Sequence, residues 1–362
     1  MSSKSTWLWM AVAAVLFAFI FIFERYFQHP EPGPKYLLPE LDARTVRTLE
    51  IQPANQLEIR VEHTNGTWEL AEPIVYPAQR ASVEKLLDAL QQLTVAHTIS
   101  EQELRKDPKA DENYGFEPPQ IALVLRGLST NRIYFGRRTT PGDEVFVRVI
   151  GIEGISVVDA DLLNLFPHNA QAWRETSLID FARVPFDQIT VTNASKNPAV
   201  QFQQDPPNNV WKMTAPIPAR ADNDKVEAAL KGLDNLQVQH FLSDDPKADL
   251  DSFGLQSPAL TIAFARGTNT LLTVDFGKES TNYPGLIYAR RSDQNTIVAV
   301  PTNALGPWRG SYELFRDRHL VRLPGPLAGI EVQGQDHFSL QWQTNNSWNV
   351  APQGFVADAK LT

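Results

Sequence analysis

Apolar and polar residues alternate twice near the start of the chain, over residues 46–52 and 57–63. Asn65-Gly66 supplies a tight turn before a third apolar segment that holds Trp68 and Leu70. A period of two residues predicts strands with one buried face, and Asn-Gly between such runs indicates a hairpin. We therefore expect a meander of short antiparallel strands.

The period then changes to that of a helix, with Ser82 as a candidate N-terminal cap. The apolar stripe consists of Val83, Leu86, Leu87, Leu90 and Leu93. Four more strands are predicted at residues 121–125, 132–135, 145–149 and 155–158, followed by a short helix at 162–166. One amphipathic helix covering a sheet accounts for this pattern.

The whole pattern occurs again further along the chain. Trp68-Glu69-Leu70-Ala71-Glu72-Pro73 returns as Trp211-Lys212-Met213-Thr214-Ala215-Pro216, and more loosely as Trp348-Asn349-Val350-Ala351-Pro352. The helical stripe returns as Val226, Leu230, Leu233 and Leu236, and Asp107-Pro108-Lys109-Ala110-Asp111 as Asp245-Pro246-Lys247-Ala248-Asp249. A repeat built mainly on packing residues predicts architecture rather than chemistry.

This repeat divides the chain into five predicted parts. They are a cytoplasmic tip and transmembrane anchor (1–28), a Pro-rich spacer (29–44), repeat 1 (45–185), repeat 2 (186–324) and the incomplete start of repeat 3 (325–362). Almost no linker separates repeats 1 and 2 near residues 183–187, so we expect them to pack as a rigid rod. Either the sequence belongs to a longer chain, or the last unit is incomplete in the molecule.

The first part contains an uncharged apolar run from Trp7 to Phe23, bracketed by Lys4 and by Glu24-Arg25. Its length is at the short end for a membrane span. A cleaved signal peptide requires small residues before the cleavage site, whereas this run ends in phenylalanine and isoleucine. We expect an uncleaved single-pass anchor in a bacterial inner (cytoplasmic) membrane, with the N-terminus in the cytoplasm and the bulk of the chain on the periplasmic side.

Composition narrows the class of function. The chain has 362 residues, of which 43% are hydrophobic and 21% charged, enough to fill more than one core. Its net charge of −9 argues against broad nucleic-acid binding. It has no cysteine, which excludes disulfides, thiolate nucleophiles and cysteine zinc sites.

The predicted fold is α+β, with an N-terminal transmembrane helix followed by tandem repeats, each a mostly antiparallel sheet with one principal amphipathic helix. With this order of elements, the chain resembles the bacterial family called domain of unknown function 4340. The resemblance rests on the N-terminal span, the repeated W-x-L/M-x-x-P before a helix, and the glycine motifs Tyr114-Gly115-Phe116 and Phe253-Gly254-Leu255 with the later Phe135-Gly136 and Phe276-Gly277. It implies an accessory role beside components of ABC-2 type exporters resembling those linked to gliding motility. It supplies no catalytic residues.

Two acidic clusters are candidate sites. Asp244, Asp245, Asp249 and Asp251 carry oxygens suited to calcium, but their spacing does not match an EF-hand loop. We interpret Asp-Pro-Lys-Ala-Asp as a loop in which Asp initiates a turn. Asp159 and Asp161 form a conceivable acid and base pair, but repeat 2 lacks both carboxylates, which favours Asp161 as a helix cap.

His97 and His240 occupy matching positions beyond the main helix of each repeat. Histidine can bind a metal or transfer protons. Here each repeat has one such His and no acid at ligand spacing, which favours a role in stabilising the C-terminus of the main helix through its macrodipole. The other histidines form no HExxH pattern. We expect no metal and no cofactor.

The remaining motifs favour a non-enzymatic protein. No nucleophile elbow, Walker loop or Gly-x-Gly-x-x-Gly occurs. Exposed tryptophan binds sugars by stacking, but Trp68, Trp211 and Trp348 recur in register, as core residues do, and Trp173 and Trp308 suit packing between units. The principal hypothesis is a membrane-anchored extracytoplasmic scaffold, contacting lipid through its helix and associated with an ABC transporter permease or auxiliary subunit. The alternative hypothesis is a cell-envelope glycan-binding module. An envelope hydrolase is the least favoured of the three hypotheses.

Overall fold

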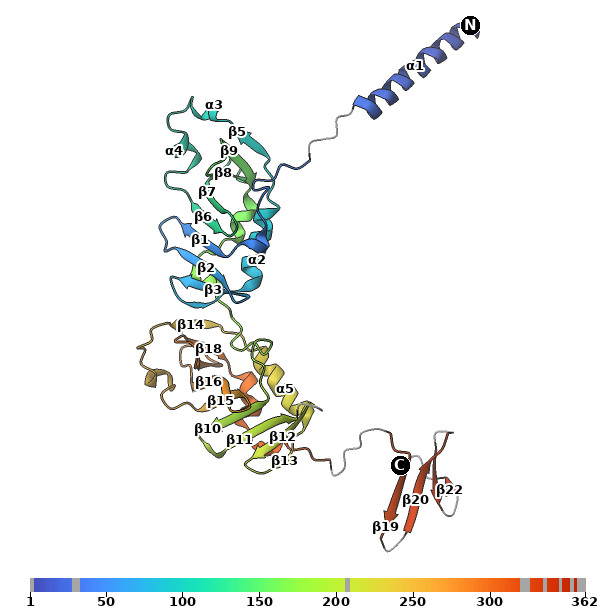
Figure 1. The fold of residues 1–362 in the computed structure, drawn as a ribbon, viewed down its shortest axis with the longest axis vertical. Helices are drawn as coiled ribbons and strands as arrows, with labels where there is room; N and C mark the ends of the chain where they lie inside the picture. The colour runs from blue at the N-terminus through green and yellow to red at the C-terminus, as the bar shows by residue number, and fades with distance from the viewer. Residues whose placement is uncertain are drawn as a thin grey trace.

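The computed structural model describes residues 3–27, 33–205, 209–319, 326–334, 337–344, 347–351 and 355–356. It contains two nine-stranded sheets and one four-stranded sheet, in which every pair of neighbouring strands is antiparallel (Figure 1). The described fold is therefore mainly β, with few helices. The predicted tandem arrangement of antiparallel sheets is confirmed.

The N-terminal helix α1 (Ser3–Phe27) has 25 residues and exposes large apolar side chains, among them Trp7, Val15 and Phe17. Within the described part of the chain, no helix has both the length and the apolarity that crossing a membrane requires. The Pro-rich tract at the start of the predicted spacer falls mostly outside the described residues.

The first sheet and its helices form unit one, whose core runs from Leu37 to Trp173. Its strands are β1 (Thr48–Pro53), β2 (Ile59–Thr64), β3 (Thr67–Glu72), β4 (Tyr76–Pro77), β5 (His97–Ile99), β6 (Ile121–Arg126), β7 (Thr130–Arg138), β8 (Glu144–Val149) and β9 (Ile155–Asp159). Its helices are α2 (Arg80–Gln91), α3 (Glu101–Leu104), α4 (Ala110–Tyr114) and the 3₁₀ turns η1 (Ala43–Thr45), η2 (Ala160–Leu165) and η3 (Ala170–Trp173). The strand order is β4-β3-β2-β1-β6-β7-β8-β9-β5.

The second sheet repeats this order as β13-β12-β11-β10-β15-β16-β17-β18-β14 and forms unit two, whose core runs from Leu178 to Phe315. Its strands are β10 (Gln188–Asn193), β11 (Lys196–Asp205), β12 (Val210–Ala215), β13 (Ala219–Arg220), β14 (His240–Ser243), β15 (Leu260–Arg266), β16 (Asn269–Glu279), β17 (Leu286–Arg291) and β18 (Ile297–Pro301). Its helices are α5 (Asn223–Asp234), α6 (Gly306–Arg309) and the 3₁₀ turns η4 (Asp251–Phe253), η5 (Asn303–Leu305) and η6 (Tyr312–Phe315).

The third sheet consists of β19 (Gly329–Gln333), β20 (His337–Trp342), β21 (Trp348–Ala351) and β22 (Phe355–Val356), in that order. The pairing repeats that of β10 to β13, the first four strands of unit two. Trp348 at the start of β21 is partly buried and contacts Trp342 edge to face.

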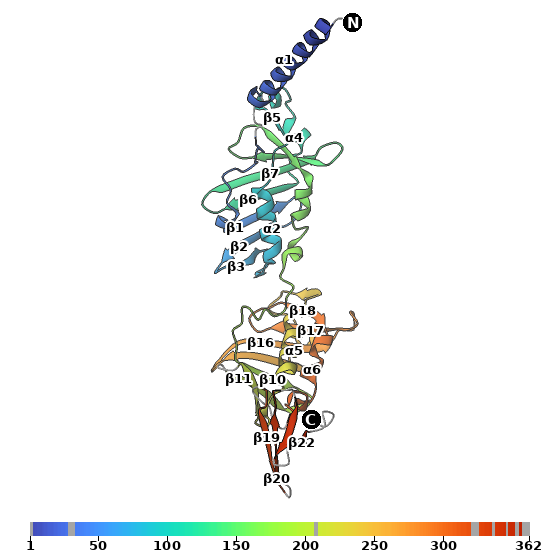
Figure 2. The same ribbon diagram turned by 90° about the vertical axis from the view of Figure 1, so that its right-hand side faces the viewer.

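Each large sheet buries one face under its main helix, α2 or α5 (Figure 2). Val83, Leu86, Leu87 and Leu90 of α2 are at most 2% exposed, and Val226 and Leu233 of α5 are fully buried. The predicted stripes are confirmed, as is the hairpin turn, where Asn65 and Gly66 both have positive φ. Burial of these side chains supplies most of the stabilisation, at about 25 cal/mol per Å² of apolar surface.

The two glycine motifs of each unit contact one another. A Cβ on Gly136 would lie 2.2 Å from the carbonyl oxygen of Tyr114, and one on Gly277 would lie 2.1 Å from that of Phe253. Gly115 and Gly254 end the preceding turns with φ of +79° and +67°. The loop after the main helix thus rests directly on the backbone of β7 or β16, which only glycine permits.

Two predictions of helix caps are wrong. Helix α2 begins at Arg80 with Gln79 as its N-cap, so Ser82 lies inside the helix. Asp159, rather than Asp161, caps η2 by accepting from the backbone N–H of Asp161. Side chains that accept at an N-terminus must precede the turn, and both predictions were placed two or three residues late.

The limits of the cores differ from the predicted parts. Leu37, Leu38 and Leu41 belong to the core of unit one although the sequence placed them in the spacer. Backbone bonds from Leu37 N to Leu93 O and from Val95 N to Lys35 O tie that segment to the end of α2. Similarly, the core of unit two begins at Leu178, because Leu178 N donates to Leu236 O.

Candidate functional site at the junction of the two units

The connection between units one and two is held by a wholly buried arginine. Arg174 directly follows η3, and its backbone bridges to Ala78 beside β4, the edge strand at one end of the first sheet. Its side chain is 0% exposed. In Figure 1 this end of unit one faces β14, an edge strand of the second sheet.

The guanidinium lies between two aromatic rings from different units. Its Cζ atom is 4.3 Å from the ring centroid of Tyr76 in unit one and 3.9 Å from that of Phe241 in unit two. The rings themselves meet edge to face at 5.4 Å. Phe241 packs against the cores of both units. A desolvated cation over an aromatic face gains about 2 kcal/mol, more than at an exposed site.

A carboxylate completes the site. Arg174 donates through Nη1 to Asp244 Oδ2 (3.0 Å) and through Nη2 to Asp244 Oδ1 (2.6 Å), a bidentate pair. Thr296 accepts from Nη2 at 3.2 Å and donates to Asp244 Oδ1 at 2.7 Å, and Gln171 accepts from Nη1 at 3.0 Å. Arg174 Nε alone has no partner among the described residues. The buried charge is thus paired with a carboxylate, and both terminal nitrogens of the guanidinium have partners, Gln171 from unit one and Asp244 and Thr296 from unit two.

The segment after Arg174, which connects the two units, is hydrogen-bonded to unit two. Val238 N donates to Thr176 O, and the Thr176 hydroxyl donates to Gln237 Oε1 at 2.7 Å. Ser177 bridges to Gln237 through its backbone. The connecting segment at residues 176–177 is therefore hydrogen-bonded to unit two, several residues before the predicted junction at 183–187.

A cleft of about 450 Å³ opens beside the junction. Its lining comes from unit one through residues 74–77 and Glu69, and from unit two through Asp244 and residues 293–296. Burial raises the pKa of Tyr76 to about 12, so its phenol stays protonated at neutral pH. Burial opposes ionisation of Asp293, but the hydrogen bond and charge of Arg291 outweigh it and lower the pKa of that carboxyl.

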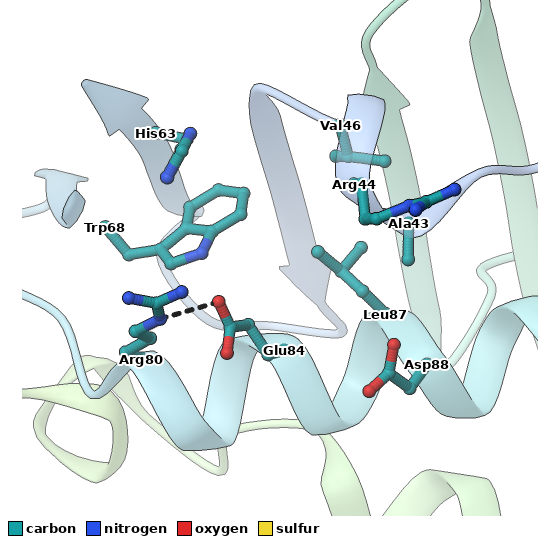
Figure 3. A pocket seen from close by; sticks show the side chains of 9 residues that line it. All are labelled: Ala43, Arg44, Val46, His63, Trp68, Arg80, Glu84, Leu87 and Asp88. Atoms are coloured by element: carbon teal, nitrogen blue, oxygen red, sulfur yellow. Dashed lines mark hydrogen bonds and ion pairs between the residues drawn. The ribbon is translucent and has the colours of Figure 1, made fainter. Parts of the chain in front are cut away.

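A separate groove lies on the helix-covered face of unit one, with a volume of about 360 Å³ (Figure 3). Trp68, Val46 and Leu87 form its apolar floor, and Arg80 donates to Glu84 at 2.7 Å along its rim. Nine side chains line it: Ala43, Arg44, Val46, His63, Trp68, Arg80, Glu84, Leu87 and Asp88. Arg47 Nη1 lies 2.7 Å from His63 Nδ1. Because arginine only donates, His63 Nδ1 accepts this hydrogen bond, and its partner is a cation rather than a carboxylate.

The equivalent position of unit two carries a groove of about 500 Å³, lined by Trp211, Glu227, Leu230 and Lys231 among others. Trp211 Nε1 donates to Glu227 Oε1 at 2.6 Å, whereas the matching Glu84 accepts from Arg80. Phe181 and Phe186 extend the aromatic packing in unit two. The grooves are therefore a feature of the repeated fold, with different charged rims.

The acidic run predicted as one cluster serves separate purposes. Asp244 binds Arg174, Asp245 Oδ1 accepts from Lys247 N at 2.8 Å, and Asp249 accepts from Asp251 N and from the Ser252 hydroxyl. Asp107 likewise accepts from Lys109 N at 3.0 Å, so the interpretation of Asp-Pro-Lys-Ala-Asp as a turn is confirmed. Among the described residues, no three acidic or histidine side chains are grouped as a metal site requires.

The other predicted candidates are dispersed. Asp159 caps η2, and Asp161 accepts from Asn164 Nδ2 at 3.4 Å. His97 and His240 do occupy matching positions, but the prediction that they stabilise a helix C-terminus is wrong. They begin the edge strands β5 and β14, whereas α2 and α5 end at Gln91 and Asp234. His240 instead stacks on Tyr283 with 4.0 Å between ring centroids.

The recurring tryptophans are core residues, as predicted for Trp68 and Trp211, which are 5% and 2% exposed. The prediction that Trp173 and Trp308 pack between units is wrong. Both are 3% exposed, and each belongs to the core of its own unit. The residue after Trp173, Arg174, makes the contact between units. Sequence reasoning missed it, although an aromatic residue followed by arginine recurs as Phe315-Arg316.

These features define a tandem-repeat protein whose units join through a buried ion pair. Residues 68–208 and 211–360 match the family described as Domain of unknown function (DUF4340), and the chain belongs to that family. The first match begins in β3 and ends beyond β11, so it spans the junction and Arg174. Neither a curated protein nor a solved structure matches the chain.

Proposed function

We propose that this protein is a membrane-anchored extracytoplasmic scaffold of an ABC-type transport system. The observation that carries the proposal is the junction, where Arg174, Phe241 and Asp244 join two units into one body without a free linker. A rigid body of this kind holds its surfaces at a set position relative to its anchor, which suits docking rather than turnover.

The anchor in this proposal is α1. Its side chains Trp7, Val15 and Phe17 are 71%, 69% and 72% exposed. Leaving large apolar side chains in water forgoes about 1.5–3 kcal/mol for each. Lipid of the inner membrane is the environment we propose for them, with units one and two on the periplasmic side.

The partner we propose is a permease or an auxiliary subunit of the transporter, as the family resemblance implies. The net charge of −9 supports a protein partner over nucleic acid. Within the described residues, Asp245 and Asp249 accept bonds in turns, Asp159 caps η2, and Asp244, which lines the cleft, is paired with Arg174, so the proposal assigns the chain no catalytic step. Glycan stacking has less support in units one and two, because Trp68, Trp173, Trp211 and Trp308 are buried there; Trp342 of the third sheet is 45% exposed.

Co-purification tests the proposal. The full chain, tagged on a C-terminal extension, is isolated from native membranes in mild detergent, and bound proteins are identified by mass spectrometry. The proposal predicts a permease or ATPase in near-equal amount. Recovery of the chain alone, while the permease is present in the same membranes, would contradict it and give priority to glycan binding.

A further inference from the structure

Unit two holds a cavity of about 370 Å³ between the β10–β11 hairpin and helix α6. Val191, Asn193 and Val200 line it from β10 and β11, and Trp308 and Tyr312 line it from α6 and η6. No residue of this lining belongs to the cleft at the junction. Small-molecule sites in proteins have volumes of about 300–1,000 Å³, so the cavity has room for a small ligand.

The indole of Trp308 provides a hydrogen-bond donor that the fold does not use. Trp308 is 3% exposed, and within the described part of the chain its Nε1 has no hydrogen-bond partner. Leaving a buried N–H group unbonded costs free energy, whereas an apolar ring packs in a core without that cost. Packing alone therefore does not explain a tryptophan at this position.

Unit one shows what the repeated fold needs at this position. Counting back three residues from the N-caps of η3 and η6 places Phe166 where unit two has Trp308. Phe166 is 4% exposed and belongs to the core of unit one, as Trp308 belongs to that of unit two. Ala170, the first residue of η3, likewise stands where unit two has Tyr312. Unit two thus carries an N–H group and a phenol at two positions that unit one fills with apolar side chains.

The rest of the polar lining consists of uncharged groups. Ser311 Oγ accepts from Glu313 N at 3.4 Å, and its hydroxyl proton, like those of Ser195 and Tyr312, has no acceptor among the described residues. No described residue of the lining is charged, in contrast to the grooves along α2 and α5. Such a lining favours a neutral ligand that carries several hydrogen-bonding oxygens.

Pro198, Val200 and the half-buried Tyr312 supply apolar surface to the same cavity. A sugar unit combines hydroxyl oxygens with an apolar ring face, and tyrosine offers an apolar ring together with a polar end. We infer that the cavity binds a neutral saccharide unit, whose oxygens accept from Trp308 Nε1 and bond with the Tyr312 hydroxyl. This site goes beyond the proposed scaffold function and does not depend on it.

The test is a sugar titration of the full chain in lipid nanodiscs, which contain no glycoside detergent to compete for the cavity. Isotope-labelled tryptophan gives the indole N–H signals in NMR spectra, and Trp308→Phe identifies the signal of Trp308. Glucose and N-acetylglucosamine are the probes, and at least one of them is expected to shift this signal saturably while the signals of Trp173 and Trp211 stay in place.

Calorimetry then compares variants for the sugar that binds. Trp308→Phe, which matches Phe166 of unit one, is expected to raise the Kd by about tenfold, and Tyr312→Phe, which removes only the phenol, by about fivefold. Tyr283→Phe, a tyrosine of unit two outside the cavity, is the matched control and leaves the Kd unchanged. If Trp308→Phe does not fold, Tyr312→Phe decides.

Three outcomes overturn the inference. One is the absence of a saturable shift of the Trp308 signal with both sugars. Another is a Kd for sugar that Tyr312→Phe leaves equal to that of Tyr283→Phe. The third is a shift with octanoate but with neither sugar, which identifies an apolar anion as the occupant. The titration involves no transporter subunit, so its failure and a failure of the co-purification are separate results.

Discussion

Units one and two share a strand order and carry an arginine at the same sheet edge, but one arginine is fully buried and the other is exposed. Arg174 binds a ring and a carboxylate of the next unit, while Arg316 reaches no such pair among the described residues. The same position in two repeats can therefore contribute differently to stability. The contribution depends on which groups pack against the residue at that position.

The largest expected effect is at the buried arginine. Arg174→Ala leaves Asp244 without its cation in a partly buried position, and breaking a buried pair costs about 3–5 kcal/mol of unfolding free energy. Arg316→Ala, at the exposed counterpart, is expected to cost under about 0.5 kcal/mol. Denaturant unfolding of the purified chain measures both. Equal losses would remove the distinction between the two edges.

Alkaline pH should weaken the same junction. The pKa of Tyr76 is raised to about 12 by burial, against an ordinary value of 10.0. Its contribution is therefore complete below pH 10 and is lost as pH rises toward 12, by about 2 kcal/mol. Tyr76→Phe removes the ionisable hydroxyl. Stability curves of the two proteins are expected to diverge only above pH 10, and parallel curves would contradict this explanation.

The glycine contacts should behave alike in both units, in contrast to the arginines. Gly136→Ala and Gly277→Ala each place a methyl group within about 2 Å of a backbone oxygen, and overpacking of this kind costs about 1–3 kcal/mol. Gly306→Ala, with open space around the position, is the control. Amide hydrogen exchange should show faster opening in the altered unit. Unchanged exchange would mean that the loop moves aside.

Helix capping distinguishes the units by a smaller amount. Asp222 caps α5 by accepting from Lys225 N, whereas its counterpart Gln79 makes no side-chain cap bond to α2. Asp222→Ala should destabilise unit two by about 1 kcal/mol, and Gln79→Asp should stabilise unit one by up to a similar amount. Thermal unfolding of both variants measures the effects. A loss on Gln79→Asp would show that Gln79 is needed for its bond with Ser82.

The fold was largely predictable because its signals are local. Alternation, the Asn65-Gly66 turn and the α2 stripe each depend on neighbouring residues, and the repeat made the helical stripe appear a second time in α5. The caps were misplaced, since Ser82 and Asp161 have the right chemistry but lie inside the turns that they were expected to begin.

The junction was not predictable in the same way. Arg174 precedes Asp244 by 70 residues and lies in the other unit, and only the apposition of two sheet edges brings it to Phe241 and Asp244. The acidic run around Asp244 was a candidate metal site because the sequence shows the carboxylate but does not show that its partner is Arg174. The only signal in the sequence was an aromatic residue followed by arginine in each unit, Trp173-Arg174 and Phe315-Arg316. This pattern could be interpreted only after the structure showed that Arg174 is buried between the units.

The central claim is that units one and two form one body through Arg174. Because the chain has no cysteine, spin labels attach cleanly at Lys85→Cys on α2 and Ala228→Cys on α5, two exposed helix positions that correspond in the repeat. Double electron–electron resonance should give a single narrow distance distribution, which Arg174→Ala broadens. A broad distribution with Arg174 in place would contradict the account, because the units would then move independently.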